Sequence, residues 1–273
     1  MIVPRLTLSN GVTIPAMGLG TYPMHDEATA AVASGLELGY RLIDTAEAYG
    51  NEEQVGRGIA ASRVPRDQIF ITTKFNRAWH SVDGVRQAAQ ASMRRLGVDY
   101  LDMLLIHWPN PGLGRYVEAF EGLLRLLDEG IIKAAGTSNF KPAHLARLHT
   151  ATGMLPQVNQ INLNPWAQRA DTVAYHRRHQ ILTESWSPIR PAALLSDPVI
   201  LAVAKDHDAT PAQVVLRWHT QHGYLPIPKS ASPARQAENL ASWDLELSEA
   251  DMAVIDDLDR GEDQVTDSDV YGH

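Results

Sequence analysis

The sequence predicts a single (β/α)8 barrel that takes in the whole chain, residues 1–273, with an N-terminal β-hairpin closing its bottom. Short apolar segments alternate with longer amphipathic segments, as strands alternate with helices in such a barrel. The apolar segments are continuous, which is typical of parallel strands buried on both faces. Polar residues stand at the end of nearly every apolar segment. A barrel gathers all its strand ends on one active face, whereas an open doubly wound sheet uses one switch point.

The composition agrees with one well-packed domain. Hydrophobic residues make up 44% of the chain and charged residues 21%, which allows a large core. The net charge of −8 argues against nucleic acid or an anionic membrane as a partner. The absence of cysteine excludes disulfides, thiolate catalysis and cysteine-ligated zinc. Because the chain has no signal-like apolar run and no 18-residue apolar stretch, we expect a cytoplasmic protein. We also expect a monomer.

The elements follow in order along the chain. Two short alternating runs flank Asn10-Gly11, a hairpin turn signal. The expected strands are residues 17–21, 41–45, 69–75, 101–107, 132–138, 157–162, 181–186 and 224–229, the first being the weakest. Expected helices include residues 26–38, 82–96, 116–129, 142–150 and 211–222. Thr210 and Ser232, each before a proline, and Ser248, three residues before an acid, are predicted N-caps.

Four side chains are predicted to meet at the ends of neighbouring strands. Asp44, Lys74 and His107 end the second, third and fourth strands, and Tyr49 lies in the loop after Asp44. A buried ammonium needs a partner, and Asp44 is the candidate partner of Lys74. A cation beside a tyrosine lowers its pKa from about 10, and a value near 7 requires about 4 kcal/mol of differential stabilisation.

This arrangement predicts a general acid, Tyr49, at the top of the barrel. A single Asp, Lys or His at a strand end is more often structural, but the four together favour catalysis.

The chain resembles the aldo-keto reductases over nearly its whole length. The motifs that carry the resemblance are GLGTY (18–22), DTAEAYGNEEQVGRGI (44–59), TTK (72–74), LDMLLIHWP (101–109), GTSNF (136–140), QVNQINLNP (157–165), SWSP (185–188) and IPKSASPARQAENL (227–240). Within the family it is most similar to bacterial 2,5-diketo-D-gluconic acid reductases, through ESWSP and LRWHTQHG. The resemblance implies a catalytic tetrad of Asp44, Tyr49, Lys74 and His107, and NADPH as cofactor without metal or flavin.

The resemblance also implies a cofactor site. Trp186 matches the residue that stacks on the nicotinamide, and Ser138, Asn139 and Gln160 match the residues that bind its carboxamide. Further contacts are expected for Gly20, Thr21 and Ser187. Ile189 and Arg190 depart from the Leu-Gly that commonly follows Ser-Pro in the family, and Arg190 is expected to contact phosphate in place of the backbone amides there.

A basic segment is predicted to select NADPH over NADH. Lys229, Ser230 and Arg235 place two cations and a hydroxyl within seven residues of an acidic protein, which suits a phosphate monoester. By resemblance this segment binds the 2′-phosphate, and Glu238 and Asn239 bind the adenine.

Aromatic residues are expected at the substrate mouth, namely Tyr22, Trp79 and Trp108. Residues 265–273 form a short, polar tail, so one wall of the mouth is expected to be open. The implied reaction is hydride transfer to aldehydes or ketones to give alcohols, with keto-sugars such as 2,5-diketo-D-gluconate, or dicarbonyls, as candidate substrates.

Competing functions fit less well. A short-chain dehydrogenase needs Lys four residues after Tyr, which occurs nowhere, and GLGTYP has Pro23 in place of the third glycine of a dinucleotide fingerprint. The histidine pairs at 176/179 and 219/222 lack the glutamate of a zinc motif and lie on expected outer helices, so no metal site is predicted. The remaining alternative is an NADPH-binding regulatory subunit with little turnover, against which the complete tetrad argues.

Overall fold

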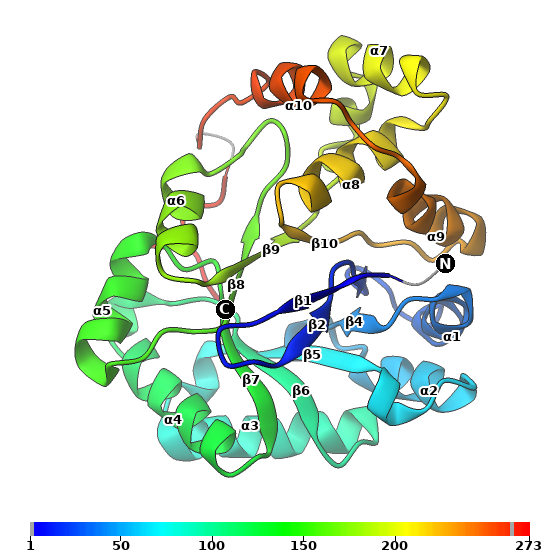
Figure 1. Cartoon of the computed structure of the whole chain (residues 1–273). Coiled ribbons are helices and arrows are strands. Elements are labelled where there is room, and N and C mark those ends of the chain that lie inside the picture. Colours follow the sequence, from blue (N-terminus) through cyan, green and yellow to red (C-terminus); the bar gives the residue numbers. More distant parts are fainter. Residues whose placement is uncertain (1–2, 263–264) are drawn as a thin grey trace.

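The computed structural model describes residues 3–262 and 265–273 and contains a parallel barrel ringed by helices (Figure 1). The strands are β1 (Arg5–Thr7), β2 (Thr13–Pro15), β3 (Leu19–Gly20), β4 (Leu42–Asp44), β5 (Phe70–Phe75), β6 (Leu101–Ile106), β7 (Ile132–Ser138), β8 (Val158–Asn162), β9 (Leu182–Trp186) and β10 (Leu225–Ile227). β3 to β10 pair in parallel in chain order. The predicted barrel is confirmed.

The ring closes between its first and last strands. The backbone N–H of Gly18 donates to Pro226 O at 3.1 Å, and that of Gly20 donates to Pro228 O at 3.1 Å. A parallel bridge also joins Gly20 to Lys229. The end of β3 therefore lies directly beside the basic segment after β10.

Helices follow the strands and cover the outside of the barrel. The α-helices are α1 (Ala28–Leu38), α2 (Glu52–Ala61), α3 (Val82–Leu96), α4 (Tyr116–Asp128), α5 (Pro142–Thr152), α6 (Ala170–Arg178), α7 (Pro198–Asp206), α8 (Pro211–Gln221), α9 (Pro233–Leu240) and α10 (Glu249–Asp256). Short 3-10 turns are η1 (Glu47–Tyr49), η2 (Arg66–Gln68), η3 (Arg77–Trp79), η4 (Pro111–Leu113), η5 (Ala192–Ser196) and η6 (Ala241–Asp244). The predicted N-caps Thr210, Ser232 and Ser248 each accept a hydrogen bond from the backbone three residues on.

The N-terminal hairpin covers one end of the barrel. β1 and β2 pair antiparallel, and the Leu8–Val12 backbone bond leaves a three-residue loop in which Gly11 has a φ of 85°. The turn is therefore one residue longer than a two-residue Asn-Gly turn, with glycine at the left-handed position. Asn10 Nδ2 donates to Lys133 O near the start of β7. The hairpin closes the end where the strands begin, as the sequence predicts.

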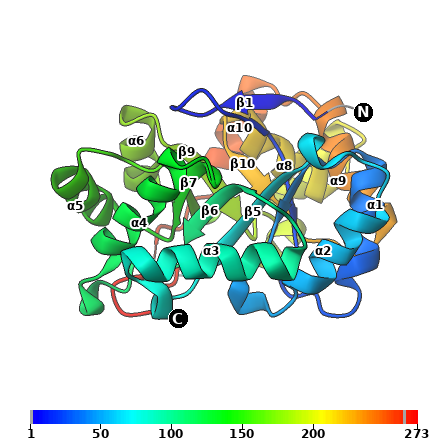
Figure 2. The same cartoon turned by 90° about the horizontal axis from the view of Figure 1, so that it is seen from below.

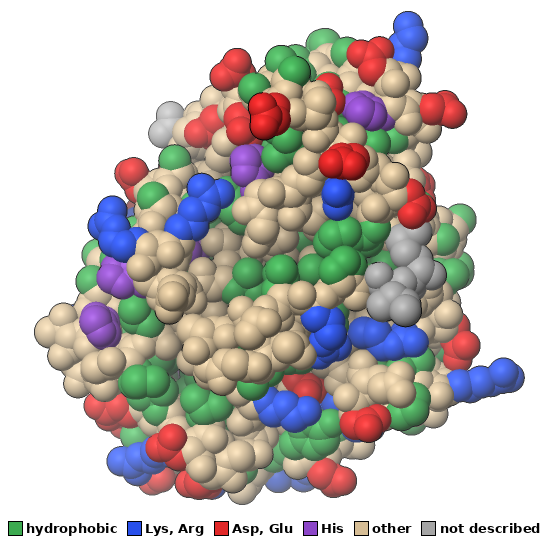
Figure 3. Space-filling view, in the orientation of Figure 1, with side chains coloured by type: hydrophobic (Ala, Val, Ile, Leu, Met, Phe, Trp, Pro, Cys, Tyr) green, Lys and Arg blue, Asp and Glu red, His purple; other side chains and the backbone are tan. Residues whose placement is uncertain are grey.

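The two ends of the barrel differ. Figure 2 shows the hairpin on one side of the molecule and the C-terminus on the opposite side. In the space-filling view of the hairpin face, side chains and backbone cover the centre of the barrel (Figure 3). Just inside this end, apolar side chains from the hairpin and strands form one cluster that includes Leu8, Ile14, Leu42, Phe70 and Val158. Polar side chains of the strands lie toward the opposite end of the barrel.

Among the described residues, none of the helices combines the length and the apolar character that a bilayer crossing requires.

Close packing of α2 on α3 gives a stability prediction. A Cβ at Gly56 would lie 2.3 Å from the backbone oxygen of Leu96, although alanine is favoured over glycine inside a helix by about 1 kcal/mol. Overpacking costs about 1–3 kcal/mol. We expect Gly56→Ala to lower the free energy of unfolding, measured in urea, by about 1–2 kcal/mol.

Gly112→Ala is the control, because a Cβ there meets nothing within 4 Å. A Gly56→Ala protein as stable as the parent would contradict the packing argument.

Candidate active site

A buried ion pair lies at the carboxyl ends of β4 and β5. Lys74 Nζ lies 2.7 Å from Asp44 Oδ1, and their side chains are 0% and 2% exposed. The ammonium also donates to Thr45 O at 2.9 Å and to the Tyr49 hydroxyl at 3.3 Å. Burial lowers the pKa of Lys74, but Asp44 and Tyr49 outweigh it and raise the pKa above its ordinary value, so the lysine is charged. The predicted Lys74–Asp44 partnership is present.

Tyr49 ends η1 and points its hydroxyl at this pair. Its ring centroid lies 4.9 Å from that of Tyr22 and 5.9 Å from that of His107. The four residues predicted to meet therefore do meet, at the end of the barrel opposite the hairpin.

The predicted direction of the Tyr49 pKa shift is wrong. Burial raises the pKa of the phenol above 10, and the nearby Lys74 ammonium opposes this rise without reversing it. The phenol is therefore protonated at neutral pH. The sequence indicates the nearby cation but not the extent of desolvation around the hydroxyl, and the desolvation decides the direction of the pKa shift.

His107 follows β6 and is neutral. Burial, then the charge of Lys74, lowers its pKa well below 6.5. Its Nδ1 has no hydrogen-bond partner within residues 3–262 and 265–273. A neutral imidazole of this kind can donate a hydrogen bond to a carbonyl oxygen.

The residues expected around a nicotinamide form one connected group. Asn139, at a φ of 64°, donates from Nδ2 to His107 O at 3.1 Å and accepts from Trp186 Nε1 at 2.9 Å. Ser138 Oγ donates to Gln160 O at 3.0 Å. Gln160 Nε2 donates to Asp44 Oδ2 at 2.8 Å, which links this group to the ion pair.

The other expected cofactor residues occupy the rim. Thr21 is buried and its hydroxyl donates to Asp44 O at 3.0 Å, beside Gly20 at the barrel closure. After β9 the chain turns at Ser187, with a φ of 52°; Ile189 packs against the core and Arg190 is exposed.

The basic segment has the donors that a phosphate requires. Lys229 and Arg235 are exposed, and neither forms an ion pair within the described part of the chain. Ser230 lies between them, buried with Asn239. Glu238 accepts a hydrogen bond from Thr210 Oγ1 at 2.8 Å. Two exposed cations beside the barrel closure fit a phosphorylated nucleotide, while the Ser230 hydroxyl donates to Ser232 O at 3.2 Å.

The aromatic mouth is held by partners that the sequence does not reveal. Trp79 Nε1 donates to both carboxylate oxygens of Glu47, at 2.9 and 3.1 Å. Glu47 precedes Tyr49 by two residues, so Trp79 is tied to the turn that carries the tyrosine. Tyr22 lies at the outer edge and is 61% exposed.

The expectation of an open wall is wrong, because the C-terminal tail lies against the mouth. The ring centroid of Tyr271 is 4.7 Å from that of Trp108, and that of His273 is 4.6 Å from that of His107. His273 O accepts from the Arg77 backbone N–H at 3.1 Å.

Ion pairs anchor this tail. Lys141 Nζ lies 2.6 Å from Asp267 and 2.5 Å from Asp269, and His144 Nε2 is 2.9 Å from Asp269. The acidic residues that made the tail look too polar to close the wall are the ones that anchor it, through these ion pairs. The features of the sequence that could have indicated this docking are the aromatic-rich ending YGH and the acidic residues before it.

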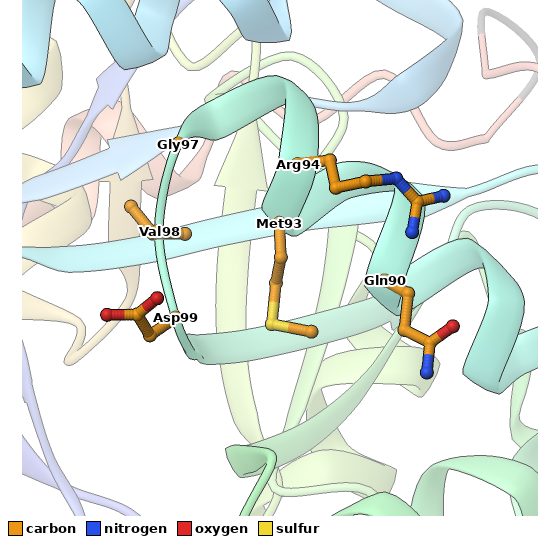
Figure 4. Close-up of a pocket in the computed structure, with 6 residues that line it drawn as sticks. All are labelled: Gln90, Met93, Arg94, Gly97, Val98 and Asp99. Carbon is orange, nitrogen blue, oxygen red and sulfur yellow. The ribbon is translucent and has the colours of Figure 1, made fainter.

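Two surface hollows in the structure are lined by no residue of the tetrad. One, of about 450 Å3, lies at the end of α3. Figure 4 shows the residues that line it, Gln90, Met93, Arg94, Gly97, Val98 and Asp99. The turn there leads into β6, so the hollow is at the barrel end where strands begin. A second, of about 350 Å3, lies between the turn after η1 and Arg95.

The histidine pairs on outer helices are structural. His176 bonds to Asn159 and Thr183, both at 2.9 Å, and His219 bonds to backbone oxygens of Val215 and Leu163. Within residues 3–262 and 265–273, no three His, Asp or Glu side chains gather as metal ligands would.

Comparison with known proteins assigns the family. A model of the Aldo/keto reductase family matches residues 16–260. An aldo-keto reductase of Mycolicibacterium smegmatis is 47% identical over 259 residues, 94% of each chain. Methylglyoxal reductase DkgA of Salmonella typhimurium is 42% identical over 271 residues, 98% of each chain. A Gox0644 variant crystallised with NADPH has a TM-score of 0.95 at 39% identity, covering 99% of each chain. The chain belongs to the aldo/keto reductase family and is an oxidoreductase, as its sequence motifs indicate.

The docked tail gives a prediction about local stability. An aromatic pair contributes about 0.5–1.5 kcal/mol beyond its buried area. We expect Tyr271→Ala, which removes the contact with Trp108, to speed amide exchange in residues 267–273 by about fivefold, at 1.4 kcal/mol per decade. Hydrogen–deuterium exchange with mass spectrometry measures this.

Val270→Ala is the neighbouring control, since Val270 is 86% exposed. Equal exchange in the two variants would show that the ring contact does not hold the tail.

Proposed function

We propose that this chain reduces small carbonyl compounds with NADPH and that Tyr49 delivers the proton. The wider class, an NADPH-dependent oxidoreductase of the aldo/keto reductase family, follows from the family match and the NADPH-bound relatives. The observation that carries the proposal is the Tyr49 hydroxyl, held 3.3 Å from Lys74 Nζ beside a neutral His107.

The residues divide the chemistry between them. When bound, NADPH supplies the hydride. Tyr49, protonated at neutral pH, donates its proton to the carbonyl oxygen as negative charge develops there. Lys74 stabilises the phenolate that remains, because a cation favours the charged form of its neighbour. His107 donates a hydrogen bond that orients the carbonyl, and Asp44 keeps Lys74 in place.

The cofactor would lie across the rim of the barrel. Trp186 would offer a flat face to the nicotinamide, and Ser138, Asn139 and Gln160 would bind its carboxamide. Gly20, Thr21, Ser187, Ile189 and Arg190 would contact the part of the cofactor between the nicotinamide and the basic segment. There Lys229, Ser230 and Arg235 would bind the 2′-phosphate, and Glu238 and Asn239 the adenine.

Compact dicarbonyls are the proposed substrates. The tail narrows the mouth between Trp108 and His107, which favours small molecules over bulky ones. Tyr22 and Trp79 would provide the remaining aromatic walls. A relative of 42% identity is named a methylglyoxal reductase, which supports methylglyoxal and similar dicarbonyls, with keto-sugars such as 2,5-diketo-D-gluconate as the second group.

Removal of one hydroxyl tests the proton donor. We expect Tyr49→Phe to keep the fold and NADPH binding but to lower kcat for methylglyoxal by about 10²–10⁴-fold, the usual contribution of a general acid. NADPH absorbance follows the reaction. Tyr175→Phe, on the outer helix α6, is the control for loss of a phenol elsewhere. Unchanged turnover in a folded Tyr49→Phe protein would refute the assignment.

The basic segment predicts cofactor preference. Hydrogen bonds to charged groups contribute about 1.5–3 kcal/mol each, and Arg235 offers a planar fork to phosphate. We expect Arg235→Ala to weaken NADPH binding by about 10- to 100-fold, at 1.4 kcal/mol per decade, and to leave NADH binding nearly unchanged. Titration of both cofactors by tryptophan fluorescence compares them. Equal losses would place Arg235 away from the 2′-phosphate.

A further inference from the structure

Glu184 is a buried acid that the reaction described above does not use. It lies in the middle of β9, is 0% exposed, and neither of its carboxylate oxygens has a hydrogen-bond partner in the described residues. Unpartnered buried carboxylates are costly, so such a group is held in its neutral form unless a positive charge comes near.

The side chain of Glu184 points into the barrel. Its neighbour Thr183 bonds outward to His176 on α6, and side chains alternate along a strand. Trp186, two residues further along β9, therefore lies on the same inner face, one layer nearer the mouth. Glu184 also pairs in register with Gln160 on β8 and with Leu225 on β10.

Charged groups act on Glu184 from across the barrel, while its strand neighbours Gln160 and Leu225 are neutral. Burial is the largest influence and raises the pKa of Glu184 to about 8; the charge of Asp44 adds to the rise, while the polar side-chain amide of nearby Gln160 and the positive charge of Lys74 oppose it. Asp44 and Lys74 already form a neutral pair. An ionised Glu184 would leave one uncompensated negative charge beside that pair.

We propose that Glu184 responds to the redox state of the bound cofactor, holding its proton in the empty and NADPH-bound protein and releasing it to solvent when NADP+ binds. The inference rests on the nicotinamide lying against Trp186, as proposed above. The oxidised ring carries a positive charge and the reduced ring does not. With NADP+ bound, an ionised Glu184 completes charge balance in the interior. The step breaks only the carboxylic O–H bond, and its proton passes to solvent.

Proton linkage makes this measurable without turnover. We expect NADP+ binding near pH 7 to release up to one proton more than NADPH binding, counted by calorimetry in buffers of different ionisation enthalpy. The affinity for NADP+ relative to NADPH should rise with pH, by up to tenfold per pH unit, and level off above about pH 8. The 2′-phosphate also titrates, but it is common to both cofactors and cancels in the comparison.

Glu184→Gln identifies the group. Because glutamine resembles the neutral acid in shape, the variant should fold, bind both cofactors, release no extra proton, and show a pH-independent affinity ratio. Glu118→Gln, at an exposed site on α4, is the control and should behave like the parent.

The outcomes separate the two proposals. Equal proton counts for NADP+ and NADPH in the parent protein, or an unchanged difference in Glu184→Gln, would overturn the role of Glu184 and leave the proposed reaction standing. Failure of the parent protein to bind either cofactor would overturn both.

Discussion

The contact between Lys74 and Asp44 is the constraint on which the site depends. An ammonium with no exposure to solvent is tolerated only if a charge and hydrogen bonds replace its hydration, and removing one partner of such a pair costs several kcal/mol. Asp44 and Thr45 supply those partners, which directs the remaining hydrogen of the ammonium to Tyr49. Gln160 holds the other carboxylate oxygen and so ties β8 to the same centre. The position of the phenol is thus set by a group buried beneath it.

The barrel and the tetrad could be predicted from the sequence because both follow from local rules. Asp44, Lys74 and His107 end apolar segments, and the ends of neighbouring parallel strands lie on one face. The hairpin followed from Asn10 and Gly11, although its loop is one residue longer than a two-residue turn. These features depend on residues close together in the chain or on the order of strands.

What the sequence did not reveal depends on long-range contact or on desolvation. The tail docks on Trp108 and His107 from more than 150 positions away, and composition alone suggested the opposite. Glu47 accepts a hydrogen bond from Trp79, 32 residues away along the chain, and no sequence pattern indicates this contact. The direction of the Tyr49 pKa shift depends on how much water the closed barrel excludes, and a nearby lysine in the sequence does not report this.

The hairpin covers the end of the barrel where the strands begin, so the polar groups of the interior face the other end. Leu8 and Ile14 pack with apolar side chains of the strands at the end where the strands begin, and the tetrad lies at the opposite end. A molecule bound across the rim of the barrel at the tetrad covers this end. A proton that leaves the interior while a cofactor is bound therefore has to pass between the cofactor and this rim. The hairpin of β1 and β2, at the far end from the tetrad, thus determines at which end of the barrel the interior polar groups exchange protons with solvent.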